Sequence, residues 1–209
     1  MPSAGVHMTL PLMLFFVAVL VPVFFSRMRS VPAWLALQAL ALGWNGVSQH
    51  PDISLHTVVA LAEVLLVRAA LVPLLLRRAI LARAEPNLDL MPSNLFSWAV
   101  AITLIVLAFE FAAPSMSDRQ AITLGVVGAT VVVALLLLAT NAAPPAQLIA
   151  LLFLENALAL FESLFPEPWP LPVHAALSSI YLLTVGVGAW LIARNEDPAV
   201  QAEEPHEPH

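Results

Sequence analysis

The sequence predicts an all-α, polytopic membrane protein with about seven transmembrane helices. The composition supports this fold class, because 60% of the 209 residues are apolar and only 11% are charged. A soluble domain is about 45–50% apolar and about 25% charged. The apolar residues form runs of roughly 20, which is the length of a membrane span. The segments between these runs are about 20 residues or shorter, so they leave no room for a soluble enzyme domain.

Apolar runs separated by helix-breaking residues define the expected spans. Pro32 stands just inside the second run, where a helix tolerates a missing N–H, and Ser54 can cap the third. The segment 166–172 contains four prolines, which predicts a stiff, non-helical connector between the last two runs. All connectors are short, so consecutive helices should be neighbours. The expected spans are residues 8–26, 31–49, 54–83, 94–113, 119–140, 145–165 and 172–193.

The distribution of arginine predicts the orientation of the chain. All 8 basic residues are arginines, and cytoplasmic loops carry an excess of such residues. If the N-terminus is outside, Arg119 is the one arginine outside, Arg68 lies within the membrane, and the others are inside. We therefore expect an N-out, C-in protein. The arginines assigned to the inside are Arg27, Arg29, Arg77, Arg78, Arg83 and Arg194.

The chain divides into three expected parts. Residues 1–140 form an N-terminal membrane region of five helices. Residues 141–195 form a C-terminal membrane region, whose start can also be placed near residue 119. Residues 196–209 form an acidic tail that we expect to be disordered. The segment 1–7 contains no Lys or Arg, so we do not expect a cleavable signal peptide.

The composition excludes several classes of cofactor and partner. The absence of cysteine excludes disulfides, thiolate metal sites and cysteine-ligated iron–sulfur clusters. The few arginines form no basic patch for nucleic acid. His7, His50 and His56 lack the spacing of metal ligands, so we interpret them as interfacial residues. His56 and His174 both begin spans and leave haem ligation as an alternative. We therefore expect no cofactor in this chain, and no nucleophile–base pair indicates catalysis.

Ionisable residues inside the expected spans are the main functional signal. Each costs at least about 2.5 kcal/mol at the centre of a membrane helix, so each needs a physical reason. Glu63 and Arg68 lie inside the third span, and Glu155 lies near the middle of the sixth. Glu110 and Glu162 each lie three residues from a span end. All five are candidates for an ion path, although Glu155 could instead stay protonated and join two helices by a hydrogen bond.

Helical spacing predicts how these residues are placed. Glu63 and Arg68 are five residues apart, which puts them about 140° apart on an α-helix, so we expect them to serve different neighbouring helices. Pro73 leaves the carbonyl of Ala69 without its usual donor and should kink the helix. Glu155 and Glu162 are seven residues apart and should share one face.

Two segments resemble known membrane subunits. The run Ala146-Gln-Leu-Ile-Ala-Leu-Leu-Phe-Leu-Glu155-Asn156-Ala-Leu-Ala-Leu resembles the second helix of the K subunit of bacterial respiratory complex I. It is closer still to the E component of hydrogenase-4-type formate hydrogenlyase complexes, in which an acidic residue directly precedes Asn. The run Val67-Arg68-Ala-Ala-Leu-Val-Pro73-Leu-Leu-Leu is similar to the same family, where the basic residue is usually Lys.

This resemblance implies a non-catalytic, multi-pass subunit of a complex I-related, ion-translocating assembly in the bacterial inner membrane. Redox centres would belong to partner chains, and large antiporter-like subunits would be the membrane partners. Glu155 and Glu63 would act as protonatable steps, and Arg68 would bias their affinity for protons. The last span departs from the K subunit because it contains no acid, so Glu162, Glu63 or a partner chain would supply the second acidic step.

Three alternatives stay open at this point. The chain could be a small subunit of a multisubunit cation/proton antiporter, although that subunit is about half as long. It could be a purely structural membrane anchor, in which Glu155 stays protonated. It could also be a haem-bearing subunit of a quinone oxidoreductase.

Overall fold

The computed structural model describes residues 3–25, 27–49, 55–81, 90, 95–113, 118–165 and 169–194, with the backbone alone for residues 3–8, 56, 118 and 171. The described residues form helices and no strand. In chain order these are α1 Ser3–Phe25, the 3₁₀ turn η1 Met28–Ser30, α2 Val31–Gln49, α3 Leu55–Glu63, the π-helix η2 Val64–Leu71, α4 Val72–Leu81, α5 Leu95–Ala112, α6 Asp118–Thr140, α7 Pro144–Glu162 and α8 Leu171–Arg194. The expected tail 196–209 and Arg83 lie outside the described residues.

Within the described residues, five helices are long and apolar enough to cross a membrane. They are the continuous α3–η2–α4 rod, α5, α6, α7 and α8, and Thr9–Phe25 of α1 forms a shorter apolar helix. Helix α2 occupies the second expected span, but Gln38 and Asn45 interrupt its apolar sequence. These lengths support a membrane protein, while the number of seven spans and the N-out orientation stay predictions.

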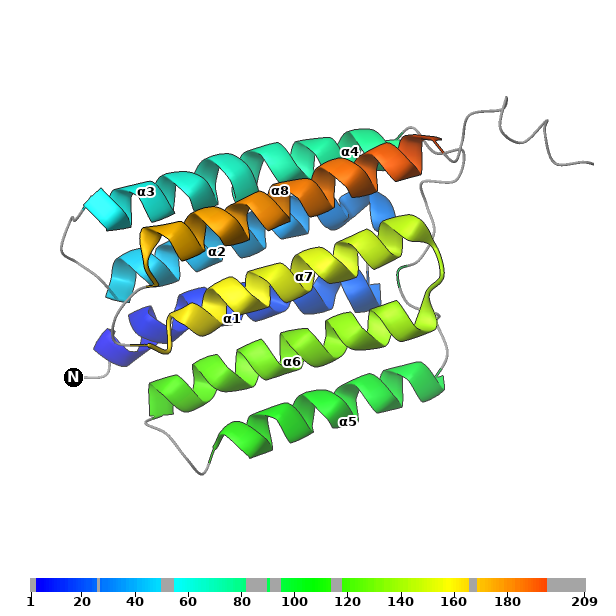
Figure 1. The fold of residues 1–209 in the computed structure, drawn as a ribbon. Helices are drawn as coiled ribbons and strands as arrows, with labels where there is room; N and C mark the ends of the chain where they lie inside the picture. The colour runs from blue at the N-terminus through cyan, green and yellow to red at the C-terminus, as the bar shows by residue number, and fades with distance from the viewer. Residues whose placement is uncertain are drawn as a thin grey trace, which may run out of the picture.

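The helices lie lengthwise beside one another in a single bundle (Figure 1). Helices α6 and α7 are the most buried of the five long apolar helices. Helix α1 packs on α2 and α6, α5 packs on the outer side of α6, and α8 packs on α4 and α7. The two expected membrane regions therefore share one apolar core, because α7 packs on both α6 and α2.

Four helix ends meet at one end of the bundle (Figure 1). Helix α2 ends there, α3 begins, α7 ends and α8 begins. Consecutive helices run in alternating directions, which brings these ends to the same end of the bundle. Side chains near these four ends can therefore surround a common space. The expectation that consecutive helices are neighbours is wrong at one step, because α4 packs on α2 and α8 whereas α5 packs on α6.

The backbone accommodates Pro73 through a change of helix type. The π-helix η2 spans Val64–Leu71, and the N–H of Val72 donates to the carbonyl of Val67, five residues earlier. The α-helical pattern resumes at Val72, next to Pro73, which has no N–H to donate. Single-turn π segments often mark functional sites, and this one contains Arg68.

Candidate functional site

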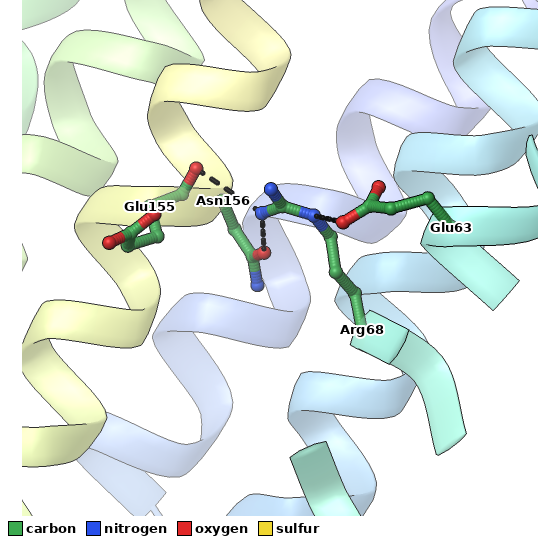
Figure 2. A network of polar contacts seen from close by, with 4 residues as sticks. All are labelled: Glu63, Arg68, Glu155 and Asn156. Atoms are coloured by element: carbon green, nitrogen blue, oxygen red, sulfur yellow. Dashed lines mark hydrogen bonds and ion pairs between the residues drawn. The ribbon is translucent and has the colours of Figure 1, made fainter. Parts of the chain in front are cut away.

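Arg68 is the centre of the polar interior. Its side chain is 5% exposed, and its Nε donates to Glu63 Oε1 at 3.0 Å. One terminal nitrogen donates to Asn156 Oδ1 at 3.0 Å and to the backbone carbonyl of Glu155 at 3.5 Å. The guanidinium thus lies between η2 and α7 and holds a partner on each side (Figure 2). The desolvation of a buried cation is offset only by a paired carboxylate together with further hydrogen bonds, and Arg68 has both.

The pairing of Glu63 with Arg68 corrects the expectation from α-helical spacing. The two residues do not serve different helices; they form an ion pair within one rod. The reason is the π-helix, because its hydrogen bonds join residues five apart and its wider turns bring such residues onto the same face. Arg68 still reaches α7 with its remaining donors, so it also links two helices.

The network continues across the bundle through amides. Asn156 Nδ2 donates to Gln38 Oε1 at 2.8 Å, which joins α7 to α2. The ring of Tyr181 on α8 covers the guanidinium, with Arg68 Cζ 4.3 Å from the ring centroid, a cation–π contact. Gln38, Asn156 and Tyr181 are completely buried. The network around the guanidinium therefore joins η2 to α7 and α8 directly, and to α2 through Asn156.

A cavity of about 440 Å³ lies beside this network. It is bounded by the last part of α2, the first part of α3, the last part of α7 and the first part of α8. Arg68, Glu63 and Glu155 line its inner part, and Glu162 and His174 line it near the helix ends. The remaining wall is mostly apolar, as in typical small-molecule cavities.

Glu155 and Glu162 occupy different positions in this cavity. The side chain of Glu155 extends away from the guanidinium (Figure 2), and its carboxylate has no ion-pair partner among the described residues. Glu162 is fixed at the end of α7, where Oε1 lies 2.8 Å from His174 Nε2 and accepts the N–H of Trp169 at 2.9 Å. The seven-residue spacing does place both on one face, because both line the cavity.

Glu110 is separate from this site. It lies near the end of α5, the helix at the edge of the bundle away from α3 and α8 (Figure 1). Its side chain is exposed. It does not line the cavity. The structure therefore brings together four of the five ionisable candidates: Glu63, Arg68, Glu155 and Glu162.

Sequence reasoning missed two amides of α2. Gln38 completes the chain from Arg68, and Asn45 is buried in the cavity wall. A signal for both was present, because they are seven residues apart on an otherwise apolar helix and so share one face. Amides in membrane helices usually bond to a neighbouring helix, which is what Gln38 does.

The described residues hold no group of three or more His, Asp or Glu side chains that could bind a metal ion. His174 pairs with Glu162, while His7, His50 and the side chain of His56 lie outside the described part of the chain. Comparisons of the chain with protein-family models, curated proteins and solved structures find no match. The argument for function therefore rests on the geometry of the site.

Proposed function

We propose that this chain is a membrane subunit of a complex I-related, hydrogenase-4-type energy-conserving complex. In this proposal it supplies part of a proton path and has no catalytic centre or cofactor of its own. The observation that carries the proposal is the position of Arg68, buried between Glu63 and Asn156 beside a cavity that Glu155 lines. Ionisable groups at such depth are expensive, and they most often mark ion paths.

The arrangement is suited to moving a proton. Glu155 has a free carboxylate beside the cavity, so it can gain and lose a proton without breaking a described ion pair. Glu63 can do so only by loosening its bond to Arg68. Arg68 stabilises negative charge on its neighbours, so a proton arriving at one carboxylate changes the balance at the other. Partner antiporter-like subunits would continue the path beyond this chain.

Glu155→Gln is the direct test of this role. Gln keeps the size and the hydrogen bonding of the residue but cannot change charge. The variant should assemble normally in its complex and should lose most proton translocation, measured with a pH-sensitive dye in sealed membrane vesicles. Glu63→Gln should have a similar effect, and the double variant should lose no more than either single one, because one break already interrupts the path.

The matched control is Glu110→Gln, which makes the same chemical change at an exposed site outside the cavity. It should leave translocation unchanged. Full translocation by Glu155→Gln, with failure of Glu155→Ala only through loss of assembly, would contradict the proposal.

A structural anchor is the second candidate, and one observation favours it. Arg68, Asn156 and Gln38 join three helices through hydrogen bonds, which a scaffold would also use. The anchor predicts normal translocation in every variant that still assembles. Mass spectrometry of the material that copurifies in mild detergent would identify the partners; purification of a well-folded, partner-free chain from native membranes would count against both candidates.

A further inference from the structure

We infer that the cavity is a water-filled inlet that opens at one end of the bundle only and closes at Arg68. The role of this inlet rests on the proposed function, because the inlet would determine from which face protons reach Glu155 and Glu63. The shape of the inlet rests on the structure alone.

The cavity wall comes from one half of the bundle. On α2 the lining residues run from Gln49 inward to Leu42, and on α7 from Glu162 inward to Glu155. Each stretch corresponds to a depth of about 10 Å at 1.5 Å per residue. On α8 the lining ends at Ser178, and on the α3–η2–α4 rod it ends at Arg68. The cavity therefore begins at the four helix ends and stops near the middle of the bundle.

Dense packing closes the other half. Beyond Arg68 the interior contains completely buried side chains from α2, η2–α4 and α8, and no cavity-lining residue comes from this part. Tyr181 lies directly over the guanidinium. The fully buried residues of this barrier are Leu35, Val72, Leu76, Tyr181 and Val185. Water that enters at the four helix ends meets Arg68 and has no straight route to the opposite face.

Asn45 indicates that the cavity contains water. Its side chain is 1% exposed, it lines the cavity, and neither its Nδ2 nor its Oδ1 has a hydrogen-bond partner among the described residues. A buried amide without partners costs about 1–3 kcal/mol for each group, so ordered water is the expected partner. A single water needs only about 10–15 Å³ of such a cavity, which offers about 440 Å³.

The charges of the wall favour protons and other cations. Three carboxylates line the cavity, from Glu63, Glu155 and Glu162, against the single guanidinium of Arg68. His174 adds a positive charge only when it is protonated. The excess of carboxylates raises the local concentration of cations, because low-dielectric walls focus the field.

Two neighbouring serines of α8 offer a direct test. Ser178 lines the cavity, whereas Ser179 is exposed on the outer side of α8. The chain has no cysteine, so Ser178→Cys and Ser179→Cys each introduce one thiol by the same small change. The probe is a cationic, membrane-impermeant methanethiosulfonate, applied to the full chain in right-side-out or inverted membrane vesicles. Ala113→Cys, directly after the end of α5, marks the face with the cavity mouth, and Thr140→Cys, at the last residue of α6, marks the opposite face, because α5 and α6 end at opposite ends of the bundle (Figure 1).

The inference predicts that Ser178→Cys reacts from the Ala113 face and not from the Thr140 face. It should react at least about tenfold faster than Ser179→Cys, because a thiol reacts as its thiolate, which requires water. An anionic reagent of the same class should be slower at Ser178→Cys than the cationic one. Val185→Cys, within the barrier, should be protected from both faces.

Three results would overturn the inference. Equal rates at Ser178→Cys and Ser179→Cys would mean that lipid, not water, occupies the cavity. Labelling of Ser178→Cys from both faces, or rapid labelling of Val185→Cys, would mean that the cavity is not closed at Arg68. Labelling does not require translocation, so the inlet and the proton path can fail separately: expected labelling with full translocation by Glu155→Gln would refute only the path.

Discussion

The two sides of the bundle are stabilised by different interactions. On the polar side, α2, α3–η2–α4, α7 and α8 meet around Arg68, and hydrogen bonds between side chains join them. On the apolar side, α1, α5 and α6 meet through aromatic and small residues. Phe109 of α5 packs edge-to-face on Phe16 of α1, with ring centroids 5.6 Å apart.

Buried polar groups behave differently on the two sides. Thr123 and Thr130 of α6 donate to carbonyls of their own helix, four residues earlier. These bonds therefore do not link α6 to another helix. Arg68 and Asn156 instead bond to residues of other elements. Hydroxyls satisfied within their own helix permit close packing, whereas groups satisfied across helices require a particular neighbour. The polar side should therefore be sensitive to chemistry, and the apolar side to volume.

Replacement of Arg68 should produce the largest effect. Arg68→Leu leaves Glu63 without its ion-pair partner and Asn156 without a donor, so the free energy of unfolding in detergent should fall by about 3–5 kcal/mol. Arg68→Lys should lose less stability, because Lys keeps the positive charge. It should still lose some, because Lys lacks the planar set of N–H donors of Arg. The control is Arg78→Leu at the exposed end of α4, which should change stability by less than about 0.5 kcal/mol. Equal losses in both Leu variants would remove the distinction between the two sides.

An added methyl group on the apolar side should have an intermediate effect. A Cβ at Gly125 of α6 would overlap Phe109 Cδ1, so the aromatic ring must move. Gly125→Ala should therefore cost about 1–3 kcal/mol of stability, measured by thermal unfolding in detergent. Gly186→Ala on α8 is the matched control, since nothing lies within 4 Å of its added Cβ. A stable Gly125→Ala variant would show that α5 and α6 tolerate extra volume.

Glu110→Gln should have the smallest effect. The carboxylate is exposed on α5 and lies outside the cavity, so the change in unfolding free energy should stay within about 0.5 kcal/mol. Thermal unfolding in detergent measures this directly. A larger loss would mean that the stability of the apolar side also depends on a charged side chain.

Local sequence patterns predicted the helices closely. The expected span 31–49 coincides with α2 Val31–Gln49, and the expected span 119–140 differs from α6 Asp118–Thr140 by one residue. Prolines, caps and apolar runs act over a few residues, so they can be read without knowledge of the fold. The same reasoning identified Glu63, Arg68 and Glu155 as ionisable residues inside the expected spans.

The partners themselves depended on tertiary structure. An α-helical wheel separates Glu63 from Arg68, and only the π-helix brings them together. Asn156 accepts from Arg68 because α7 lies beside η2, and it reaches Gln38 because α7 also packs on α2. Sequence determined which side chains were too costly to leave unpaired in an apolar interior. Packing decided which of them meet, because that depends on helix faces brought together from distant parts of the chain.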